Sequence, residues 1–396
     1  MSLTDTPNAN RLHIALFGRR NSGKSSLINA LTGQDIALVS NTPGTTTDLV
    51  SKAMEIQGIG PCLFIDTPGF DDEGELGELR ISRTLKAIEK TDIALLLCED
   101  TTFFHEKEIL ALLKEKNIPV IPVLNKIDIR ENSDHLATYI EEQCKIHPLL
   151  ISAKEKIGIE LIRQTILEKL PSDFGQQSIT GKLVAENDLV LLVMPQDIQA
   201  PKGRLILPQV QTIRELLDKK CLVMTCTTDK FSATLQALAR PPKLIITDSQ
   251  VFKAIYEQKP KESELTSFSV LFAGYKGDIH YYVESAAVIE RLTESSRVLI
   301  AEACTHAPLS EDIGRVKLPR LLRKWIGENL QIDMVAGTDF PQDLTPYSLV
   351  IHCGACMFNR KYVLSRIERA REQHIPMTNY GVAIAFLNGI LDQIKY

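Results

Sequence analysis

A glycine-rich segment early in the chain has the residue types and spacing that bind a chain of phosphates. Residues 18–25 read Gly-Arg-Arg-Asn-Ser-Gly-Lys-Ser and fit the pattern GxxxxGK[ST], directly after an apolar run and before a helix-like segment. In this pattern glycines let backbone N–H groups wrap the phosphates, the lysine meets the β and γ charges, and the hydroxyl ligates Mg²⁺. The motif therefore predicts a nucleoside triphosphate site with Ser25 on the Mg²⁺ ion. The residues expected to contact the nucleotide here are Gly18, Asn21, Ser22, Gly23, Lys24, Ser25 and Ser26.

Three later segments complete this nucleotide site. Residues 66–69, Asp-Thr-Pro-Gly, follow an apolar run, so that Asp66 lies near the Mg²⁺ shell and the Gly69 N–H meets the γ-phosphate. Residues 125–128, Asn-Lys-Ile-Asp, follow another such run, and the Asp128 carboxylate can accept both hydrogen bonds from the N1–H and N2–H₂ edge of guanine. Adenine cannot offer that edge, so the sequence predicts guanine. The residues expected around the base are Asn125, Lys126, Asp128, Ser152, Ala153 and Lys154.

Three cysteines in the last third of the chain have spacings that could hold a metal. Cys304 closes the apolar run 297–303, Cys353 closes the run 349–352, and Cys356 follows in a Cys-x-x-Cys turn. If the sheet is parallel, both strand ends open onto one edge, where the three thiolates could converge. Three cysteines without a fourth nearby favour an iron-sulfur cluster with one exchangeable ligand over a Cys₄ zinc site. Zinc with three cysteines and a histidine is the main alternative, and a redox pair is another.

The other cysteines and histidines have no metal-ligand spacing. A free thiol in an apolar run behaves as a small hydrophobe, so these cysteines are expected in the core. They are Cys62, Cys98, Cys221 and Cys226, with Cys144 in a helix-like segment. The charge-rich residues 106–116 are interpreted as a solvated helix face.

Bulk properties limit the function classes. The chain has 396 residues, 44% of them hydrophobic and 24% charged, which is typical of a globular protein of two or three domains. A net charge of -5 argues against a nonspecific nucleic-acid binder. Residues 1–10 lack the layout of a secretory signal, and we find no run of about 18 apolar residues, the length needed to span a membrane. We therefore expect a cytoplasmic protein without nucleic-acid or membrane partners, in which the eight cysteines stay reduced.

Hydrophobic patterning predicts an α/β protein in three parts. Residues 1–171 alternate short apolar runs with amphipathic stretches, which is typical of a doubly wound fold, and residues 171–180 form a linker. A second α/β domain is expected at 180–262 and a third domain at 265–379, while a helical tail at 380–396 could pack on the second domain. Expected strands of these two domains are 189–194, 221–225, 243–247, 267–273, 297–303, 332–336 and 348–351, with helices at 209–219 and 232–239.

Roughly the first 170 residues resemble translation-factor-like GTPases, most closely the TrmE and Era branch. In that branch the asparagine that matches Asn21 helps to bind a K⁺ ion, which takes roughly the place of an arginine finger. Phe70 stands where Ras-like enzymes carry the glutamine that orients the attacking water, and it cannot do so. Residues 41–48 look like the first switch loop, with Thr46 as a Mg²⁺ ligand. The resemblance implies slow, potassium-stimulated GTP hydrolysis, with Lys24, Asn21, Asp66 and Gly69 as the catalytic set.

The whole chain resembles the HydF family, GTPases and scaffold proteins of FeFe-hydrogenase maturation. The residues that carry this are Cys304-Thr305-His306 and residues 352–356, His-Cys-Gly-Ala-Cys, in which Ala355 replaces the usual second glycine. The resemblance implies GTPase, dimerisation and cluster-binding domains in that order, and a 4Fe-4S cluster on the three cysteines. Its fourth iron would be open to His306, His352, an acidic residue, water or a bridging group. Neighbours in a strand point to opposite faces, so His352 should turn away from such a cluster.

This resemblance also implies partners. The protein would be a homodimer that receives a di-iron precursor from radical-SAM maturases and delivers it to apo-hydrogenase, with GTP hydrolysis as a conformational timer. Two alternatives remain open. A ribosome- or RNA-associated GTPase should carry a basic appended domain, and none is evident. A GTP-regulated iron-sulfur electron-transfer protein should cycle reversibly by one electron without transferring iron.

Overall fold

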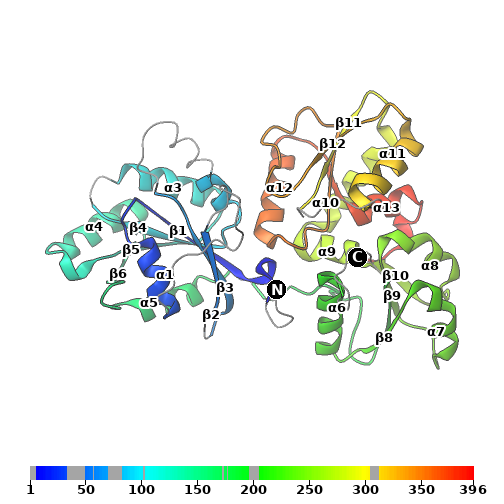
Figure 1. Cartoon of the computed structure of the whole chain (residues 1–396), viewed down its shortest axis with the longest axis horizontal. Helices are drawn as coiled ribbons and strands as arrows, with labels where there is room; N and C mark the ends of the chain where they lie inside the picture. The colour runs from blue at the N-terminus through cyan, green and yellow to red at the C-terminus, as the bar shows by residue number, and fades with distance from the viewer. Residues whose placement is uncertain are drawn as a thin grey trace. The chain divides into compact units, whose positions relative to one another are not determined.

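The chain folds into two compact units, Met1–Phe174 and Gly175–Tyr396 (Figure 1). The computed structural model describes residues 6–33, 50–56, 58–69, 83–100, 103–171, 174–175, 177–195, 205–303 and 312–396. None of the described helices is both long and apolar enough to cross a membrane. Each unit is an α/β fold built on mainly parallel strands, as the patterning predicts.

The first unit is a doubly wound sheet. Its strand order is β2-β3-β1-β4-β5-β6, and among the described residues only β2 pairs antiparallel with its neighbour. Helices α1 and α5 pack on one face and α3 and α4 on the other, so β1 and β4 are buried along their whole length. Strands covered on both faces become continuous apolar runs, which is why the sequence shows them clearly. The elements are η1 (Asn8–Asn10), β1 (Leu12–Gly18), α1 (Lys24–Thr32), β2 (Val50–Ile56), β3 (Gly60–Asp66), β4 (Ile93–Cys98), α3 (Phe104–Glu115), β5 (Val120–Leu124), η2 (Ile127–Ile129), α4 (Ser133–Cys144), β6 (Leu149–Leu150) and α5 (Ile159–Glu168).

The second unit contains two four-stranded sheets, β10-β9-β7-β8 and β12-β11-β13-β14, in which every pairing is parallel. Buried side chains of both sheets, such as Leu191 and Leu299, belong to one hydrophobic cluster. Its elements up to α9 are β7 (Leu189–Val193), α6 (Leu207–Asp218), β8 (Leu222–Cys226), η3 (Thr228–Lys230), α7 (Phe231–Ala237), β9 (Leu244–Thr247), η4 (Ser249–Val251), α8 (Phe252–Gln258), β10 (Glu264–Ser267) and α9 (Phe268–Lys276). The remainder are α10 (Ile279–Ala286), η5 (Ala287–Arg291), β11 (Arg297–Ala301), η6 (Ile313–Lys317), α11 (Leu318–Ile326), β12 (Gln331–Val335), β13 (Leu349–His352), α12 (Arg360–Glu372), β14 (Met377–Asn379), α13 (Tyr380–Leu387) and η7 (Leu391–Gln393). The division of this unit into two domains at 262–265 stays a prediction.

The strand expected at 267–273 is wrong, because helix α9 occupies most of that segment. Strand β10 ends at Ser267, whose hydroxyl accepts a hydrogen bond from the Val270 N–H at 3.2 Å and caps the helix. A short apolar run fits a buried helix as well as a buried strand. Helix α9 buries Phe268 and Phe272 against the first sheet of this unit and Ala273 in the cluster that both sheets share. It therefore joins the two sheets.

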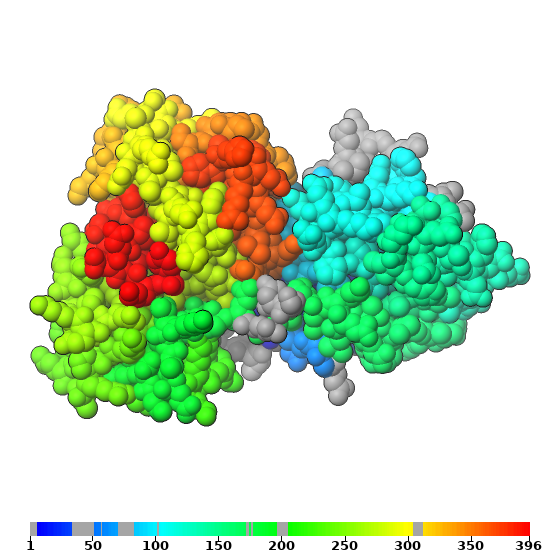
Figure 2. Space-filling view, turned by 180° about the vertical axis from the view of Figure 1, so that it is seen from behind, coloured from blue at the N-terminus to red at the C-terminus, as the bar shows by residue number. Residues whose placement is uncertain are grey.

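The end of the chain packs on strand β10. The Lys395 N–H donates to Leu265 O at 2.9 Å, and the Thr266 hydroxyl donates to Lys395 O at 2.6 Å. Ile394 is buried in the shared cluster. Figure 2 accordingly shows the red C-terminal residues beside the yellow-green part of the chain.

The cysteines expected in the core are confirmed there. Cys62, Cys98, Cys144 and Cys221 are buried, and Cys226 is half-buried against the shared cluster. Burial raises the pKa of Cys62 to about 12 and that of Cys144 to about 11. These thiols are therefore uncharged packing groups.

Candidate functional site

The phosphate-binding motif forms a turn between β1 and α1. Gly23 has a φ of +91° and precedes the first helical residue, Lys24. A Cβ at Gly23 would collide with the side-chain amide of Asn125, so only glycine fits both the backbone and the space. The turn opens at the carboxyl edge of the sheet, where α/β folds bind ligands.

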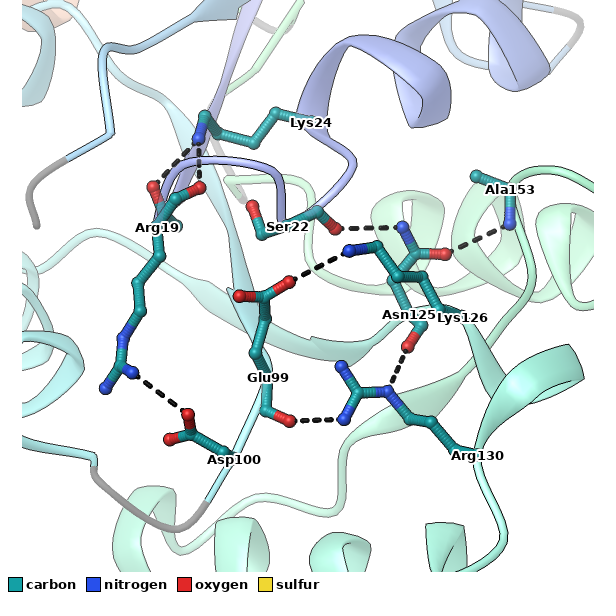
Figure 3. Close-up of polar contacts among 10 residues, drawn as sticks. Arg19, Ser22, Lys24, Glu99, Asp100, Asn125, Lys126, Arg130 and Ala153 are labelled. Atoms are coloured by element: carbon teal, nitrogen blue, oxygen red, sulfur yellow. Dashed lines mark hydrogen bonds and ion pairs between the residues drawn. The ribbon is translucent and has the colours of Figure 1, made fainter.

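The side chain of Lys24 folds back over this turn (Figure 3). Its ammonium donates to Gly18 O at 2.8 Å and to Arg19 O at 2.7 Å, and the residue is buried. A buried ammonium needs such acceptors. A phosphate oxygen would compete with these two carbonyls for the same charge.

Arg19 fixes the turn to helix α3. Its Nε and Nη2 lie 2.9 and 3.2 Å from the two carboxylate oxygens of Glu106, and its Nη1 lies 3.1 Å from Asp100 Oδ2. Glu106 is only 1% exposed, so the interpretation of residues 106–116 as a solvated face is wrong for this residue. A forked pair of this kind is directional and keeps both charges hydrogen-bonded. The sequence reasoning missed both residues; the arginine within the glycine-rich turn was the available signal.

Two residues expected at Mg²⁺ lie together. The Ser25 hydroxyl donates to Asp66 Oδ2 at 2.7 Å, which joins the start of α1 to the end of β3. Burial raises the pKa of Asp66, while the Ser25 hydrogen bond and the Lys24 charge oppose that rise. A hydroxyl and a carboxylate are oxygen donors of the kind Mg²⁺ prefers. Thr46, the third expected ligand, lies outside the described residues, as do Phe70 and residues 41–48.

Asn125 joins the phosphate-binding turn to the region expected to hold the base. Its Nδ2 donates to Ser22 O at 3.0 Å and its Oδ1 accepts from the Ala153 N–H at 3.0 Å (Figure 3). Asp128 is exposed at this edge, and a hydrogen bond from Ser152 lowers its pKa. Its carboxylate is thus an ionised acceptor open to solvent.

Glu99 and Arg130, which the sequence reasoning missed, support this loop. Lys126 Nζ lies 3.1 Å from Glu99 Oε1, and Arg130 Nε donates to Asn125 O at 3.1 Å (Figure 3). Arg130 also donates to the Glu99 carbonyl. The carboxyl ends of β4 and β5 are therefore tied together beside Asp128.

The second candidate site lies at the carboxyl edge of the β12-β11-β13-β14 sheet. Strands β11 and β13 are parallel neighbours with Ala301 opposite His352, so both end at one edge, as predicted. Cys353 Sγ accepts hydrogen bonds from the Ala303 N–H at 3.0 Å and the Ala355 N–H at 3.4 Å. The backbone that leads into Cys304 therefore lies against Cys353.

The structure describes part of the expected ligand set. Cys304 and His306 lie outside the described residues. Cys353 and Cys356 are half-buried, and no cluster of three or more potential ligands is found within the ranges the structure covers. Burial raises the pKa of Cys353 to about 11, and the N–H groups of Ala355 and Ala303 oppose that rise. Two N–H groups aimed at one sulfur are suited to a thiolate that binds metal, so this donor set fits a cluster ligand.

The turn between the two cysteines has unusual backbone geometry. Ala355 has a φ of +50°, a conformation that favours glycine and costs other residues roughly 1–2 kcal/mol. Its methyl group is buried in the shared cluster, which offsets about 0.8 kcal/mol of that cost. Lys276, at the end of α9, donates to the carbonyls of Ala355 at 3.1 Å, Cys356 at 3.3 Å and Phe358 at 2.6 Å. A buried lysine that sequence reasoning missed thus closes the turn.

His352 makes a hydrogen bond through each ring nitrogen. Its Nε2 lies 2.8 Å from Arg366 Nη1, and its Nδ1 lies 2.8 Å from Cys353 O. Because a guanidinium can only donate, Nε2 is the acceptor and Nδ1 carries the proton. Burial and the Arg366 charge lower the pKa of His352 to about 3. The imidazole is neutral, and a role as fourth ligand through Nε2 would require Arg366 to release it.

Comparisons with protein families divide the chain in three. Residues 13–126 match the 50S ribosome-binding GTPase family, residues 179–277 match the hydrogen maturase F dimerization domain, and residues 280–395 match the hydrogen maturase F tetramerization domain. The two hydrogen maturase F domains together span more than half of the chain. The first unit therefore contains a GTPase domain, and the second consists of domains specific to one family.

Curated GTPases are similar to part of the chain. The tRNA modification GTPase MnmE of Dechloromonas aromatica is 40% identical over 159 residues, which are 39% of this chain and 34% of that protein. GTPase Der of Wolinella succinogenes is 35% identical over 192 residues, which are 44% of this chain and 40% of that protein. The chain thus spans well under half of the length of these relatives.

Two solved structures are similar to part of the chain. A variant of Aquifex aeolicus Era bound to GDP.AlF4- has a TM-score of 0.35 and 21% identity, over 54% of this chain and 92% of that chain. The G domain of the T. maritima FeoB iron transporter has a TM-score of 0.33 and 25% identity, over 40% of this chain and 98% of that chain.

We predict that acid destabilises the second unit through His352. Its pKa of about 3 in the folded state is below the ordinary 6.5, so the unfolded state binds the proton more readily. Stability is therefore full above about pH 6.5 and falls by up to about 1.4 kcal/mol per pH unit below it. His352→Gln keeps an acceptor for Arg366 and removes the titration, so its loss of stability between pH 7 and pH 5 should be smaller.

Urea unfolding followed by the fluorescence of Trp325 measures this difference. Trp325 is the single tryptophan of the chain and lies in α11, which packs on the same sheet. His147→Gln is the control, because His147 is exposed in the first unit and pairs with Glu141. Equal pH dependence in wild type and His352→Gln would contradict the prediction.

Proposed function

The chain belongs to the hydrogen maturase F family, and from this premise we propose that it is a GTP-hydrolysing scaffold that carries a 4Fe-4S cluster. It would assemble or deliver the di-iron precursor of the FeFe-hydrogenase active site to apo-hydrogenase. The observation that carries this proposal is the Cys353 sulfur at the carboxyl edge of β11 and β13, with two backbone N–H groups directed at it.

Cys304, Cys353 and Cys356 are the proposed cluster ligands. Ala303, the neighbour of Cys304, donates to Cys353 Sγ, and this supports a common site for sulfurs that are 49 positions apart in sequence. The fourth position stays open in this proposal, because both nitrogens of His352 are engaged. A bound cluster would supply an iron with an exchangeable site, where the precursor could attach.

The nucleotide site is proposed to hydrolyse GTP with Mg²⁺ and K⁺. Lys24 would bind the phosphates, Ser25 and Asp66 the Mg²⁺ shell, and Asn21 the K⁺ ion. With K⁺ in place of an arginine finger, hydrolysis would be slow and stimulated by potassium. The convergence of Ser25 and Asp66 supports this assignment.

GTP turnover is proposed to time the exchange of partners. The radical-SAM maturases and apo-hydrogenase are the partners implied by the family, and the cytoplasm is the compartment where they would meet. The first switch loop expected to respond to GTP, residues 41–48, lies outside the described residues. In this proposal the switch loops are the two-state element that hydrolysis shifts.

Strand β8 is the proposed homodimer edge. It pairs with β7 on one side and is the last strand of its sheet, and its burial pattern is largely exposed. Leu222 is 51% exposed and Met224 is 39% exposed. An apolar edge strand is a template for pairing with another chain, and the dimerization domain match includes it.

Similarity to tRNA-associated GTPases covers only part of the chain. The MnmE relatives are named for tRNA modification, but they match about 40% of this chain, which in turn covers only about a third of their length. Residues 179–395 match domains of the hydrogen maturase family instead. This favours a hydrogenase maturation role over an RNA-associated one.

Cysteine variants test the scaffold proposal. Cys353→Ser and Cys356→Ser should lose most of the iron bound by wild type after anaerobic reconstitution with iron and sulfide, since each removes a ligand from the cluster. Iron and sulfide analysis with EPR measures this, and GTP hydrolysis should be unchanged. Cys226→Ser is the control, because Cys226 is a half-buried thiol at the end of β8. Full iron in the two variants, or zinc in place of iron in wild type, would refute the cluster assignment.

Asp128→Asn tests the guanine contact. Replacing the carboxylate removes a charged acceptor for two hydrogen bonds, each worth roughly 1.5–3 kcal/mol, so GTP affinity should fall about 100-fold or more. The new amide can donate to the carbonyl that xanthine has in place of the guanine amino group. XTP should therefore bind the variant more tightly than it binds wild type. Titration with both nucleotides measures this, and Asp134→Asn in the first turn of α4 is the control. An unchanged preference for GTP would place the base elsewhere.

Charges on β8 test the dimer edge. Leu222→Asp with Met224→Asp should shift the dimer to a monomer, because like charges would face each other across the paired strands. Light scattering coupled to size-exclusion chromatography measures the mass. Met334→Asp on β12, the edge strand of the other sheet, is the matched control, since Met334 is similarly exposed. A variant that stays dimeric while Met334→Asp dissociates would move the interface to β12.

A further inference from the structure

The second unit buries an arginine that has no carboxylate partner among the described residues. Arg366 lies on α12 and is 1% exposed. Within the described ranges, its contacts are a histidine, a carbonyl, a phenol and three aromatic rings, with no acidic side chain among them. Burying a guanidinium without a counter-ion costs free energy, so its presence here needs a compensating interaction.

Three aromatic rings surround the guanidinium. Its Cζ lies 4.7 Å from the ring centroids of Phe340, Phe358 and Tyr362. It also donates to Gly337 O at 2.6 Å and to the Tyr362 hydroxyl at 3.3 Å. Cation–π contacts strengthen when the pair is desolvated, and three of them fix the plane of the side chain. Arg366 is therefore held rigidly.

This rigid group grips both ends of the cysteine turn. On one side its Nη1 donates to His352 Nε2 at 2.8 Å, and the His352 Nδ1–H donates to Cys353 O at 2.8 Å. On the other side Arg366 stacks on Phe358, whose carbonyl accepts from Lys276. Both ends of the turn at 353–356 are thus held by the Arg366 guanidinium, one end through His352 and the other through Phe358.

We propose that Arg366 is a positioning residue for the metal-binding turn. It holds residues 352–358 in the conformation that directs the Ala303 and Ala355 N–H groups at Cys353 Sγ before any metal binds. Its charge, which has no carboxylate partner in the described part of the chain, then compensates the anionic ligand set to which Cys353 belongs. The charge compensation rests on the proposed cluster, whereas the positioning of the turn does not.

The guanidinium carries a permanent positive charge and reaches the Cys353 carbonyl through His352. It thus acts on the turn through its charge as well as through its hydrogen bonds. A neutral side chain of similar length in its place would lose both effects. A lysine would keep the charge and lose the fork that reaches His352 and Gly337 together.

Three variants separate these effects. Arg366→Met removes charge and fork, and Arg366→Lys removes the fork alone. Arg369→Met is the matched control, because Arg369 lies one turn along α12 and faces the same Phe340 ring at 5.7 Å but donates to Pro341 O. All three are made in the full chain, and circular dichroism establishes that each is folded.

Amide hydrogen exchange in the metal-free protein tests the positioning claim. Exchange of the Ala303 and Ala355 N–H groups should be at least tenfold faster in Arg366→Met and Arg366→Lys than in wild type and Arg369→Met. Unchanged exchange in a folded Arg366 variant would overturn the claim. If Arg366→Met does not fold, Arg366→Lys decides the outcome. This measurement needs no iron, so it stands even if the proposed cluster fails.

The reduction potential of the reconstituted protein tests the charge. Loss of a nearby cation disfavours the more negative, reduced cluster, so at a fixed potential Arg366→Met should hold about tenfold less reduced cluster. That ratio corresponds to a midpoint lower by about 59 mV. Arg366→Lys and Arg369→Met should stay near wild type. Equal midpoints in Arg366→Met and wild type, measured by EPR-monitored titration, would overturn the charge role, and a wild type without iron would overturn the proposed function instead.

Discussion

The hydrogen bonds that the Ala303 and Ala355 N–H groups donate to Cys353 Sγ are the constraint on which the geometry of the second candidate site depends. They bring together the end of β11 and the turn after β13. Two buried cations stabilise this turn. Lys276 donates to its carbonyls, and Arg366 holds it through His352. A metal that bound here would find its first sulfur already oriented.

The same geometry organises the GTPase unit. In both units parallel strands end at a common edge, so loops from distant parts of the sequence meet there. In the first unit Asn125 performs the joining role, between Ser22 and Ala153. In the second, a sulfur takes that place. One architectural rule thus produces a phosphate-binding edge and a thiol-bearing edge within a single chain.

Sequence reasoning predicted the candidate site residues but not the residues that support them. The glycine-rich turn, Asp128 and the strands before Cys353 were predictable because spacing and apolar runs are local properties. The segment 267–273 was misjudged because a short apolar run does not distinguish a strand from a helix, although Ser267 offered a cap. Glu106 was misjudged because its partner, Arg19, is far away in sequence.

The contacts of the buried cations could not be predicted from the sequence for the same reason. Arg366 lies in a helix rich in charge, and nothing in its neighbours distinguishes it from the other arginines of α12. The role proposed for it rests on rings and acceptors contributed by residues 337–362, which only the fold brings together. Lys276 and the cysteine turn are likewise about 80 residues apart. Long-range contacts of this kind need coordinates.

Anomalous diffraction at the iron edge, from anaerobic crystals of the reconstituted protein, tests the central claim most directly. We expect anomalous peaks for iron within bonding distance of Cys353 Sγ and Cys356 Sγ. The Ala303 and Ala355 N–H groups should still be directed at the Cys353 sulfur, and Arg366 should still donate to His352. Iron bound elsewhere, or a single zinc ion between these cysteines, would contradict the claim.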